Sequence, residues 1–190
     1  SIAYIDVSHN GALTELRCDN NQLTGLDVSG NSVLEYLSCG SNQLTDLDVS
    51  KNSELEKLFC YLNDISALDL SENSNLNTLD CWGNQLSCLN LKNGNNVNLQ
   101  LFYAKNNIRL TCIDVDDVIW SENNWDDESY FRIDSLVSFT ENCSASCFSS
   151  GIAKIENKVI RAYPNPFTSS TTLEFPNPSN ERHTLSLYDF

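Results

Sequence analysis

The chain has 190 residues and a net charge of −15. This acidity makes nucleic acid and anionic membrane surfaces poor partners, because both repel a negatively charged protein. No stretch approaches the ~20 apolar residues that a membrane-spanning helix needs, so the sequence predicts no membrane span.

Residues 13–96 consist of four segments of 21 residues that share the pattern L-x-x-L-x-C-x-x-N-x-L. Inside each segment apolar and polar residues alternate, as at Leu16 and Cys18, which predicts a strand with one buried face. Residues 2–13 match the second half of such a segment, and the chain contains no methionine. We therefore interpret it as a processed or trimmed fragment whose missing start could have carried a signal peptide.

The pattern resembles the leucine-rich repeat with cysteine at the third apolar position. This resemblance implies a repeat solenoid, mainly β and right-handed, with a parallel sheet along one side. One asparagine per unit would satisfy backbone groups at the turn after the strand: Asn21, Asn42, Asn63, Asn84 and Asn107. Such a solenoid presents an extended surface without a closed pocket, so we expect a binding protein and not an enzyme.

The second half of each unit also alternates, as at Leu23, Leu26 and Val28, and is expected to be extended, with turns or short 3₁₀ pieces as the alternative. The repeats should end at residue 117, after a fifth unit that is lengthened by an insertion at 93–98. Residues 118–147 break the period and are predicted to cap the open end of the core. Asp116 or Asp117 could begin a short helix there. Large apolar side chains for this cap are Trp120, Trp125, Tyr130, Phe131 and Phe139.

Residues 148–162 have the character of a linker, and residues 163–190 hold all four prolines of the chain. Alternation predicts two strands, at 171–175 and 184–188. The motifs Y-P-N-P-F at 163–167 and L-S-L-Y-D at 185–189 resemble the start of the type IX secretion C-terminal sorting domain, a small β-sandwich. This resemblance implies a bacterial protein that is secreted or held at the outer cell surface, with the type IX machinery as a partner.

Eight cysteines fall into two sets of four. Cys18, Cys39, Cys60 and Cys81 occupy one inward position per unit and are interpreted as buried free thiols, because a ladder spreads thiolates along an axis whereas a metal needs them at one point. A disulfide between neighbouring rungs would strain two strands in register.

The other four cysteines are Cys88, Cys112, Cys143 and Cys147, which allow three pairings. Cys112 opens the cap and Cys143 closes it, so a bridge there would staple the cap; Cys88–Cys112 with Cys143–Cys147 is the alternative. The segment L-T-C-I-D-V-D-D…W…E-N-C resembles caps of secreted bacterial leucine-rich repeat proteins, and this resemblance implies Cys112–Cys143. No zinc site is predicted, since no C-x-x-C pair or nearby histidine supports one.

No known catalytic motif occurs, and the two histidines, His9 and His183, lie far apart. One carboxylate or amide recurs in each unit: Asp27, Asp48, Asp69, Asn90 and Asp114. We expect these side chains to bond to the adjoining backbone or to Ser29, Ser50 and Ser71. No cofactor is expected; calcium between stacked carboxylates, or at Asp114, Asp116, Asp117, Asp126, Asp127 and Glu128 of the cap, is the alternative.

The exposed strand positions form three columns if the strands are in register. The candidate ligand-binding residues on this concave face are Tyr36, Phe59, Tyr61, Trp82, Tyr103, Arg17, Asp80 and Lys105. A group of exposed aromatic side chains favours a protein or glycan ligand. The alternative is cross-strand packing that only stabilises the sheet.

The predicted function is therefore that of an exported adhesion or binding protein. One alternative is an accessory module of a larger secreted enzyme whose catalytic part precedes residue 1. Another is ice binding by an outward hydroxyl column, made of Thr24, Thr45, Ser66, Ser87 and Thr111. The varied residues beside this column would spoil the flatness that such a surface needs.

Overall fold

A computed structural model of the protein describes residues 1–125, 129–143, 170–175 and 183–188. The chain divides into two units, Ser1–Ser150 and Gly151–Phe190. The expected linker at 148–162 lies outside the described residues. In the described part, no helix is long and apolar enough to cross a membrane.

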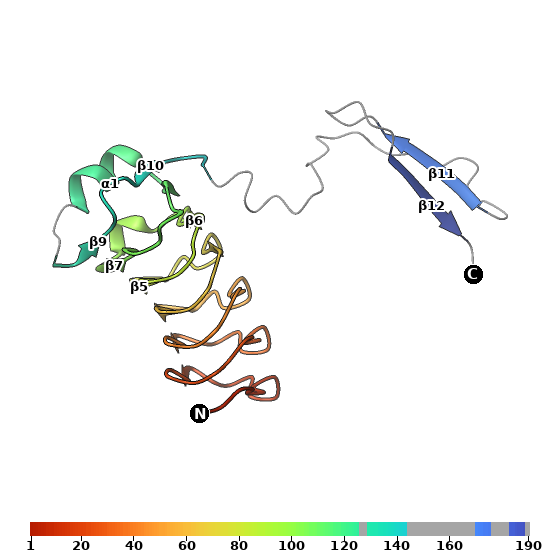
Figure 1. The fold of residues 1–190 in the computed structure, drawn as a ribbon, viewed down its shortest axis with the longest axis horizontal. Helices are drawn as coiled ribbons and strands as arrows, with labels where there is room; N and C mark the ends of the chain where they lie inside the picture. Colours follow the sequence, from red (N-terminus) through yellow and green to blue (C-terminus); the bar gives the residue numbers. More distant parts are fainter. Residues whose placement is uncertain (126–128, 144–169, 176–182, 189–190) are drawn as a thin grey trace. The chain divides into compact units, whose positions relative to one another are not determined.

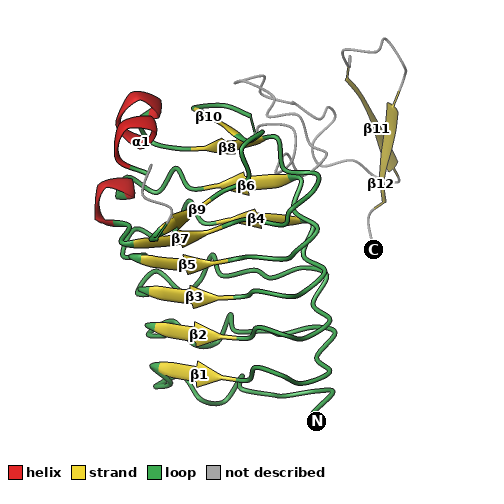
Figure 2. Cartoon of the chain, turned by 60° about the vertical axis from the view of Figure 1, so that its left-hand side comes forward, coloured by secondary structure: helices red, strands yellow, loops and turns green. Residues whose placement is uncertain are grey.

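The first unit is a solenoid whose turns each place one short strand in a six-stranded parallel sheet (Figure 2). Its strands are, in spatial order, β1 (Glu15–Arg17), β2 (Tyr36–Ser38), β3 (Lys57–Phe59), β5 (Thr78–Asp80), β7 (Leu101–Tyr103) and β9 (Phe131–Arg132). The register joins Leu16 to Leu37 and Leu37 to Leu58, one repeat apart. The predicted 21-residue period and parallel sheet are confirmed.

A second sheet runs along another side of the solenoid but covers only its later turns. It contains β10 (Ser138–Thr140), β8 (Cys112–Asp114), β6 (Cys88–Asn90) and β4 (Ala67–Asp69) in that order. The extended second half is thus confirmed from the third unit onward, whereas the equivalent residues of the first two units form no strand and follow a bend at Thr24 and Thr45. Gly25 and Asp46 stand where β4 begins with Ala67, and glycine and aspartate are both poor strand formers.

The core is a column of inward side chains repeated in every turn. Leu37, Leu58 and Leu79 are fully buried, and so are Leu23 and Val28 of the second half. Leu26 is only partly buried and packs against the core from its edge. Burying each leucine contributes roughly 1.5–3 kcal/mol, so the stability of this fold is distributed along the repeats.

The predicted asparagine ladder joins neighbouring turns. The amide of Asn42 donates to the carbonyl oxygens of Cys18 (3.0 Å) and Cys39 (2.9 Å), and its oxygen accepts from the Leu23 backbone N–H (3.0 Å). Three groups that the turn would leave without partners are thereby satisfied by one side chain.

A second ladder was not predicted. Asn31, Asn52 and Asn73 are fully buried, although their positions resemble solvated turns in the sequence. The amide of Asn52 donates to Val28 O (3.0 Å) and to Asn31 O (2.8 Å), and Asn73 repeats this arrangement one turn later. These asparagines therefore hold the corners of the solenoid together from inside.

The fifth turn is longer than the others, as expected. A short 3₁₀ helix, η1 (Asn96–Asn98), accommodates the insertion. After it, Phe102 and Ile113 return to the core and are fully buried.

The end of the core is covered by α1 (Val118–Asn124) and the chain that follows it (Figure 1). The Asp117 carboxylate accepts from the Trp120 backbone N–H at 2.9 Å and caps the helix, as predicted. Trp125 is 6% exposed. Its ring contacts those of Phe102, Trp120, Phe131 and Phe139. Tyr130 is 55% exposed, so its expected place in this cover is wrong.

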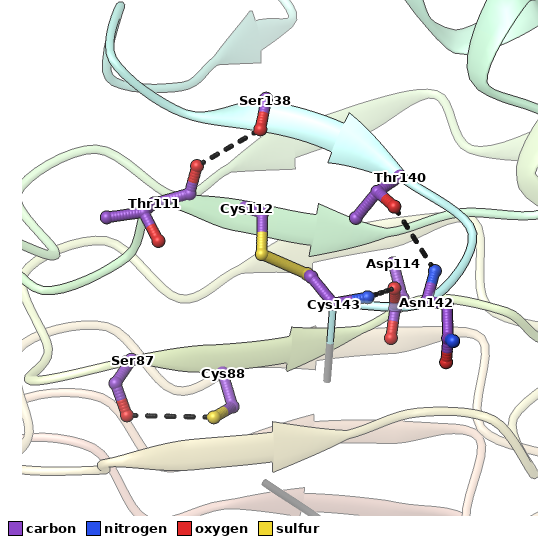
Figure 3. The surroundings of a disulfide bond; sticks show 9 residues. All are labelled: Ser87, Cys88, Thr111, Cys112, Asp114, Ser138, Thr140, Asn142 and Cys143. Carbon is purple, nitrogen blue, oxygen red and sulfur yellow. Dashed lines mark hydrogen bonds between the residues drawn. A yellow bond between two sulfur atoms is a disulfide. The ribbon is translucent and has the colours of Figure 1, made fainter. Parts of the chain in front are cut away.

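A disulfide joins Cys112 in β8 to Cys143, which follows β10 (Figure 3). This is the pairing that the resemblance implied, and it excludes the alternative Cys88–Cys112 bridge. Cys88 is disulfide-bonded as well, so it is not a free thiol. Cys147 lies outside the described residues.

The second unit contains one described hairpin. Strands β11 (Ser170–Phe175) and β12 (His183–Tyr188) pair antiparallel with Ser170 opposite Tyr188. The two predicted strands are confirmed. The Y-P-N-P-F motif lies outside the described residues.

Candidate functional site

The candidate site is the outward surface of the six-stranded sheet together with the second residue after each of its first five strands; we call it the strand face. The register places Phe59 beside Asp80 and Asp80 beside Tyr103. Backbone hydrogen bonds continue the alignment past the strands, for example from Leu62 N to Trp82 O (2.8 Å) and from Gly83 N to Lys105 O (3.0 Å). All three predicted columns are therefore in register.

In the N-terminal half of the strand face the rings pack against neighbouring side chains. The rings of Tyr36 and Phe59 lie 5.4 Å apart, and the Arg17 guanidinium lies 4.2 Å from the centre of the Tyr36 ring. Arg17 also forms an ion pair with Glu15. These contacts are cross-strand packing of the kind that stabilises a sheet.

Tyr61 packs in a similar way. Its ring lies over Gly40, and its hydroxyl is 3.5 Å from an oxygen of Asp19, which also accepts from the Gly40 N–H. Burial, and after it the charge of Asp19, raises the pKa of the Tyr61 hydroxyl. The interpretation of the aromatic residues as sheet packing thus applies to this half of the face.

The C-terminal half is different, because its side chains surround a hollow of about 370 Å³. The lining residues are Asp80, Trp82, Tyr103, Lys105 and Arg132. We call this the Trp82 hollow.

The Trp82 ring makes fewer contacts than Tyr103, the other aromatic ring of the Trp82 hollow. The backbone N–H of Trp82 donates to Asp80 Oδ1 at 3.1 Å, but no described residue makes a ring contact or a side-chain hydrogen bond with its indole. Tyr103, by contrast, donates its hydroxyl to Ser129 O (2.9 Å) and carries the Arg132 guanidinium 4.9 Å from its ring centre.

The charges of the strand face contrast with those of the whole chain. Residues 1–143 contain seven lysines and arginines, and four of them lie on this face: Arg17, Lys57, Lys105 and Arg132. The face also carries Glu15, Asp19 and Asp80, so its charges nearly balance in a chain whose net charge is −15. Burial raises the pKa of Asp80, while the Trp82 N–H and the positive charge of Arg132 act in the opposite direction.

Arg132 is the residue of the Trp82 hollow that sequence reasoning missed. It belongs to β9, which pairs in parallel with β7 and sets Arg132 beside Tyr103. The two residues are 29 positions apart, so the 21-residue period contains no signal for this contact.

The recurring carboxylates have the structural role that was expected. Oδ1 of Asp27, Asp48 and Asp69 accepts from the backbone N–H two residues later, at 2.9–3.1 Å. Hydrogen bonds from Ser29 and Ser50 lower the pKa values of Asp27 and Asp48. Among the described residues no three histidine, cysteine or acidic side chains gather as metal ligands, and Asp126, Asp127 and Glu128 lie outside that part.

The cysteine ladder consists of free, buried thiols, as predicted: Cys18, Cys39, Cys60 and Cys81. Burial raises the pKa of Cys18 to about 11 and also raises those of Cys39, Cys60 and Cys81 above the ordinary thiol value. These thiols therefore act as small apolar side chains. The outward hydroxyl column, including Thr45 and Ser66, is exposed as expected.

No protein-family model and no curated protein match the chain. Among solved structures it is similar to the functional domain of InlJ from Listeria monocytogenes, which is described as including a cysteine ladder. The two are 26% identical with a TM-score of 0.48, over 76% of this chain and 34% of that one. The chain thus spans about a third of the length of that structure.

Proposed function

We propose that this leucine-rich-repeat-like solenoid is a non-catalytic binding protein that uses its strand face to hold a protein or a glycan. The observation that carries the proposal is the Trp82 ring, which has no partner among the described residues while the rings of Tyr36, Phe59 and Tyr61 do. Trp82 is half-buried, and a large aromatic side chain beside charged groups that has no ring or hydrogen-bond partner is typical of a binding surface.

The architecture is consistent with this role. Repeats of constant length keep the inward side chains alike, while the outward positions vary from Arg17 to Phe59 to Tyr103 along one column. A surface built in this way can be fitted to a ligand without altering the core.

An extracellular location is part of the proposal. The Cys112–Cys143 disulfide favours an oxidising compartment. The resemblance of residues 163–190 to the start of a type IX sorting domain favours export through that machinery to the outer cell surface of a bacterium. In this view residues 1–117 bind, residues 118–147 cap the solenoid and residues 148–162 link it to the sorting segment.

The test is a binding screen of the full chain against a glycan array and biotinylated cell-surface proteins, run beside Trp82→Ala. The matched control is Tyr4→Ala, since Tyr4 is 74% exposed and lies outside the strand face. We expect a ligand that Trp82→Ala loses and Tyr4→Ala keeps, with unchanged circular dichroism. Absence of any ligand, or binding that is indifferent to Trp82→Ala, would overturn the proposal.

A further inference from the structure

We infer that the Trp82 hollow binds a sugar residue that bears a single carboxylate, such as a uronic or sialic acid at the end of a glycan. This inference rests on the proposed function and names the ligand class of the same face. It follows from the size of the hollow, the Trp82 ring that no described side chain stacks on, and the pairing of its charges.

The size of the hollow indicates one ring-sized group. At about 370 Å³ it lies near the lower end of the range of roughly 300–1,000 Å³ for small-molecule sites. A helix or a long peptide segment would need a groove along the whole strand face. However, the N-terminal half of the face is occupied by the contacts of Tyr36, Phe59 and Tyr61.

The Trp82 indole supplies a flat apolar platform. The electron-rich face of an aromatic ring attracts the polarised C–H groups that line one side of a pyranose ring. Tyr103 is less suited to this, because the Arg132 guanidinium already lies against its ring. The sugar ring is therefore expected to stack on the Trp82 indole.

The Lys105 side chain supplies a cation for the carboxylate. Lys105 is partly buried in the hollow wall, and no described residue forms an ion pair or hydrogen bond with its ammonium group. Arg132, on the adjacent strand, adds a second positive charge. An ammonium group in such a position forms a charge-assisted hydrogen bond with a carboxylate oxygen.

Asp80 determines what the rest of the ligand must contain. One of its oxygens accepts from Trp82 N at 3.1 Å, and a carboxylate has room for further donors. A phosphate or sulfate would bring mostly acceptors toward this carboxylate, whereas a sugar brings hydroxyl donors. The combination of Asp80 with Lys105 thus matches a ligand that has hydroxyl groups and one carboxylate.

The charge of the whole chain limits the ligand further. A long polyanion would extend beyond the hollow and meet the field of a protein with a net charge of −15. A terminal or isolated acidic sugar avoids this repulsion, because its charge stays beside Lys105 and Arg132.

The test uses the full chain on an array of uronate- and sialate-terminated oligosaccharides, each paired with its carboxyl-reduced form. The two members of a pair differ only in carrying a carboxylate or a primary alcohol. Three variants are compared: Lys105→Gln, Trp82→Ala, and Lys51→Gln as the control with the same charge change at an exposed site outside the face. Circular dichroism and melting temperature confirm that each variant is folded.

We expect binding to the acidic member of at least one pair, about tenfold or more above its reduced form, as for one hydrogen bond to a charged group. Lys105→Gln should remove that preference, Trp82→Ala should remove binding, and Lys51→Gln should change neither. Raising the salt concentration should weaken the acidic member selectively.

The outcomes separate this inference from the proposed function. If the wild-type chain binds a protein or a neutral glycan through Trp82 but shows no preference within any pair, the acidic-sugar inference is overturned and the binding function stands. A preference for the acidic member that survives Lys105→Gln would also overturn the inference, because another group would then bind the ligand carboxylate. No Trp82-dependent binding in either experiment would overturn both.

Discussion

The ring of Tyr61 lies directly over Gly40, so that a Cβ atom added to Gly40 would come within 2.5 Å of the ring carbons Cε1 and Cζ. The two residues occupy the same outward column in successive turns. Glycine is needed here for the close approach of a ring and not for its backbone freedom. The pair therefore couples two repeats on the surface of the solenoid.

Gly40→Ala should consequently displace the Tyr61 ring and lower the free energy of unfolding by about 1 kcal/mol, the low end of the cost of overpacking, because the ring is the far end of a surface side chain. Gly25→Ala is the control, because nothing lies within 4 Å of a Cβ atom at Gly25 and a substitution there should be nearly neutral. Urea denaturation measures both. Combining Gly40→Ala with Tyr61→Ala should recover part of the loss, and a simple sum of the two effects would refute the contact.

Leu62 is predicted to be locally strained. One residue per turn at this position has a left-handed backbone, and the others are Asn20, Ser41, Gly83 and Asn106. Leu62 adopts φ of 50° although its branched side chain disfavours that region. Leu62→Asn should therefore stabilise the protein by about 1 kcal/mol, part of the usual left-handed penalty. Leu62→Ala lacks the side-chain amide whose local hydrogen bonds let asparagine adopt this region, so it should not stabilise the protein. An equal gain from both variants, measured by thermal unfolding, would exclude backbone strain as the cause.

The buried asparagine ladder predicts a large effect for a polar residue at a corner. Asn52→Ala removes the side-chain donors to Val28 O and Asn31 O, which keep the backbone N–H groups of Asn31 and Leu34 as partners. We expect a loss of about 1–3 kcal/mol, since two hydrogen bonds of roughly 0.5–1.5 kcal/mol each are lost. Ser53→Ala, at the exposed neighbouring position, should be neutral. A small effect of Asn52→Ala in chemical denaturation would show that water replaces the amide.

The cysteine ladder predicts graded protection of thiols. Iodoacetamide at pH 8 should modify Cys18 first, because Cys39, Cys60 and Cys81 are completely enclosed. The rate at Cys18 should keep rising with pH toward its raised pKa of about 11. The folded state keeps these thiols protonated above pH 9.0, the ordinary thiol pKa, whereas the unfolded state loses the protons there. The contribution of the thiols to the free energy of unfolding is therefore fully present below pH 9 and decreases as the pH rises further. Peptide mass spectrometry measures the order, and rapid labelling of Cys60 in the folded protein would contradict it.

The cap disulfide should stabilise the end of the solenoid. Cys112 and Cys143 are 31 residues apart, and Cys112→Ser should cost about 2–4 kcal/mol through the entropy of the open loop. Cys112→Ser/Cys143→Ser should cost no more than the single change, because both remove one bond. Non-reducing peptide mapping should recover the two cysteines linked, and a free thiol at Cys112 would rule the bridge out.

Much of the fold could be predicted because every repeat has the same spacing of apolar residues. Leu16, Leu37 and Leu58 recur at 21 residues, and only an in-register parallel stack buries all of them. Two features were missed for different reasons. Asn31 and its equivalents have the same period, but asparagine after a strand is usually a solvated turn residue, so their burial was not inferred. The second sheet begins only at β4, where alanine replaces the glycine and aspartate of earlier turns.

The sequence by itself determined the solenoid, the inward columns of leucine and cysteine, and which side chains share the strand face. All of these follow from a period that the chain repeats. Only the tertiary structure decided that the Tyr61 ring lies over Gly40, that the Trp82 ring has no stacking partner among the described residues, and that Arg132 of the cap lies against Tyr103. The repeat period specifies whether a side chain points inward or outward and in which column it lies. Which side chains it touches depends on the size of the neighbour one turn away and on how the non-repeating cap folds back onto the last strand.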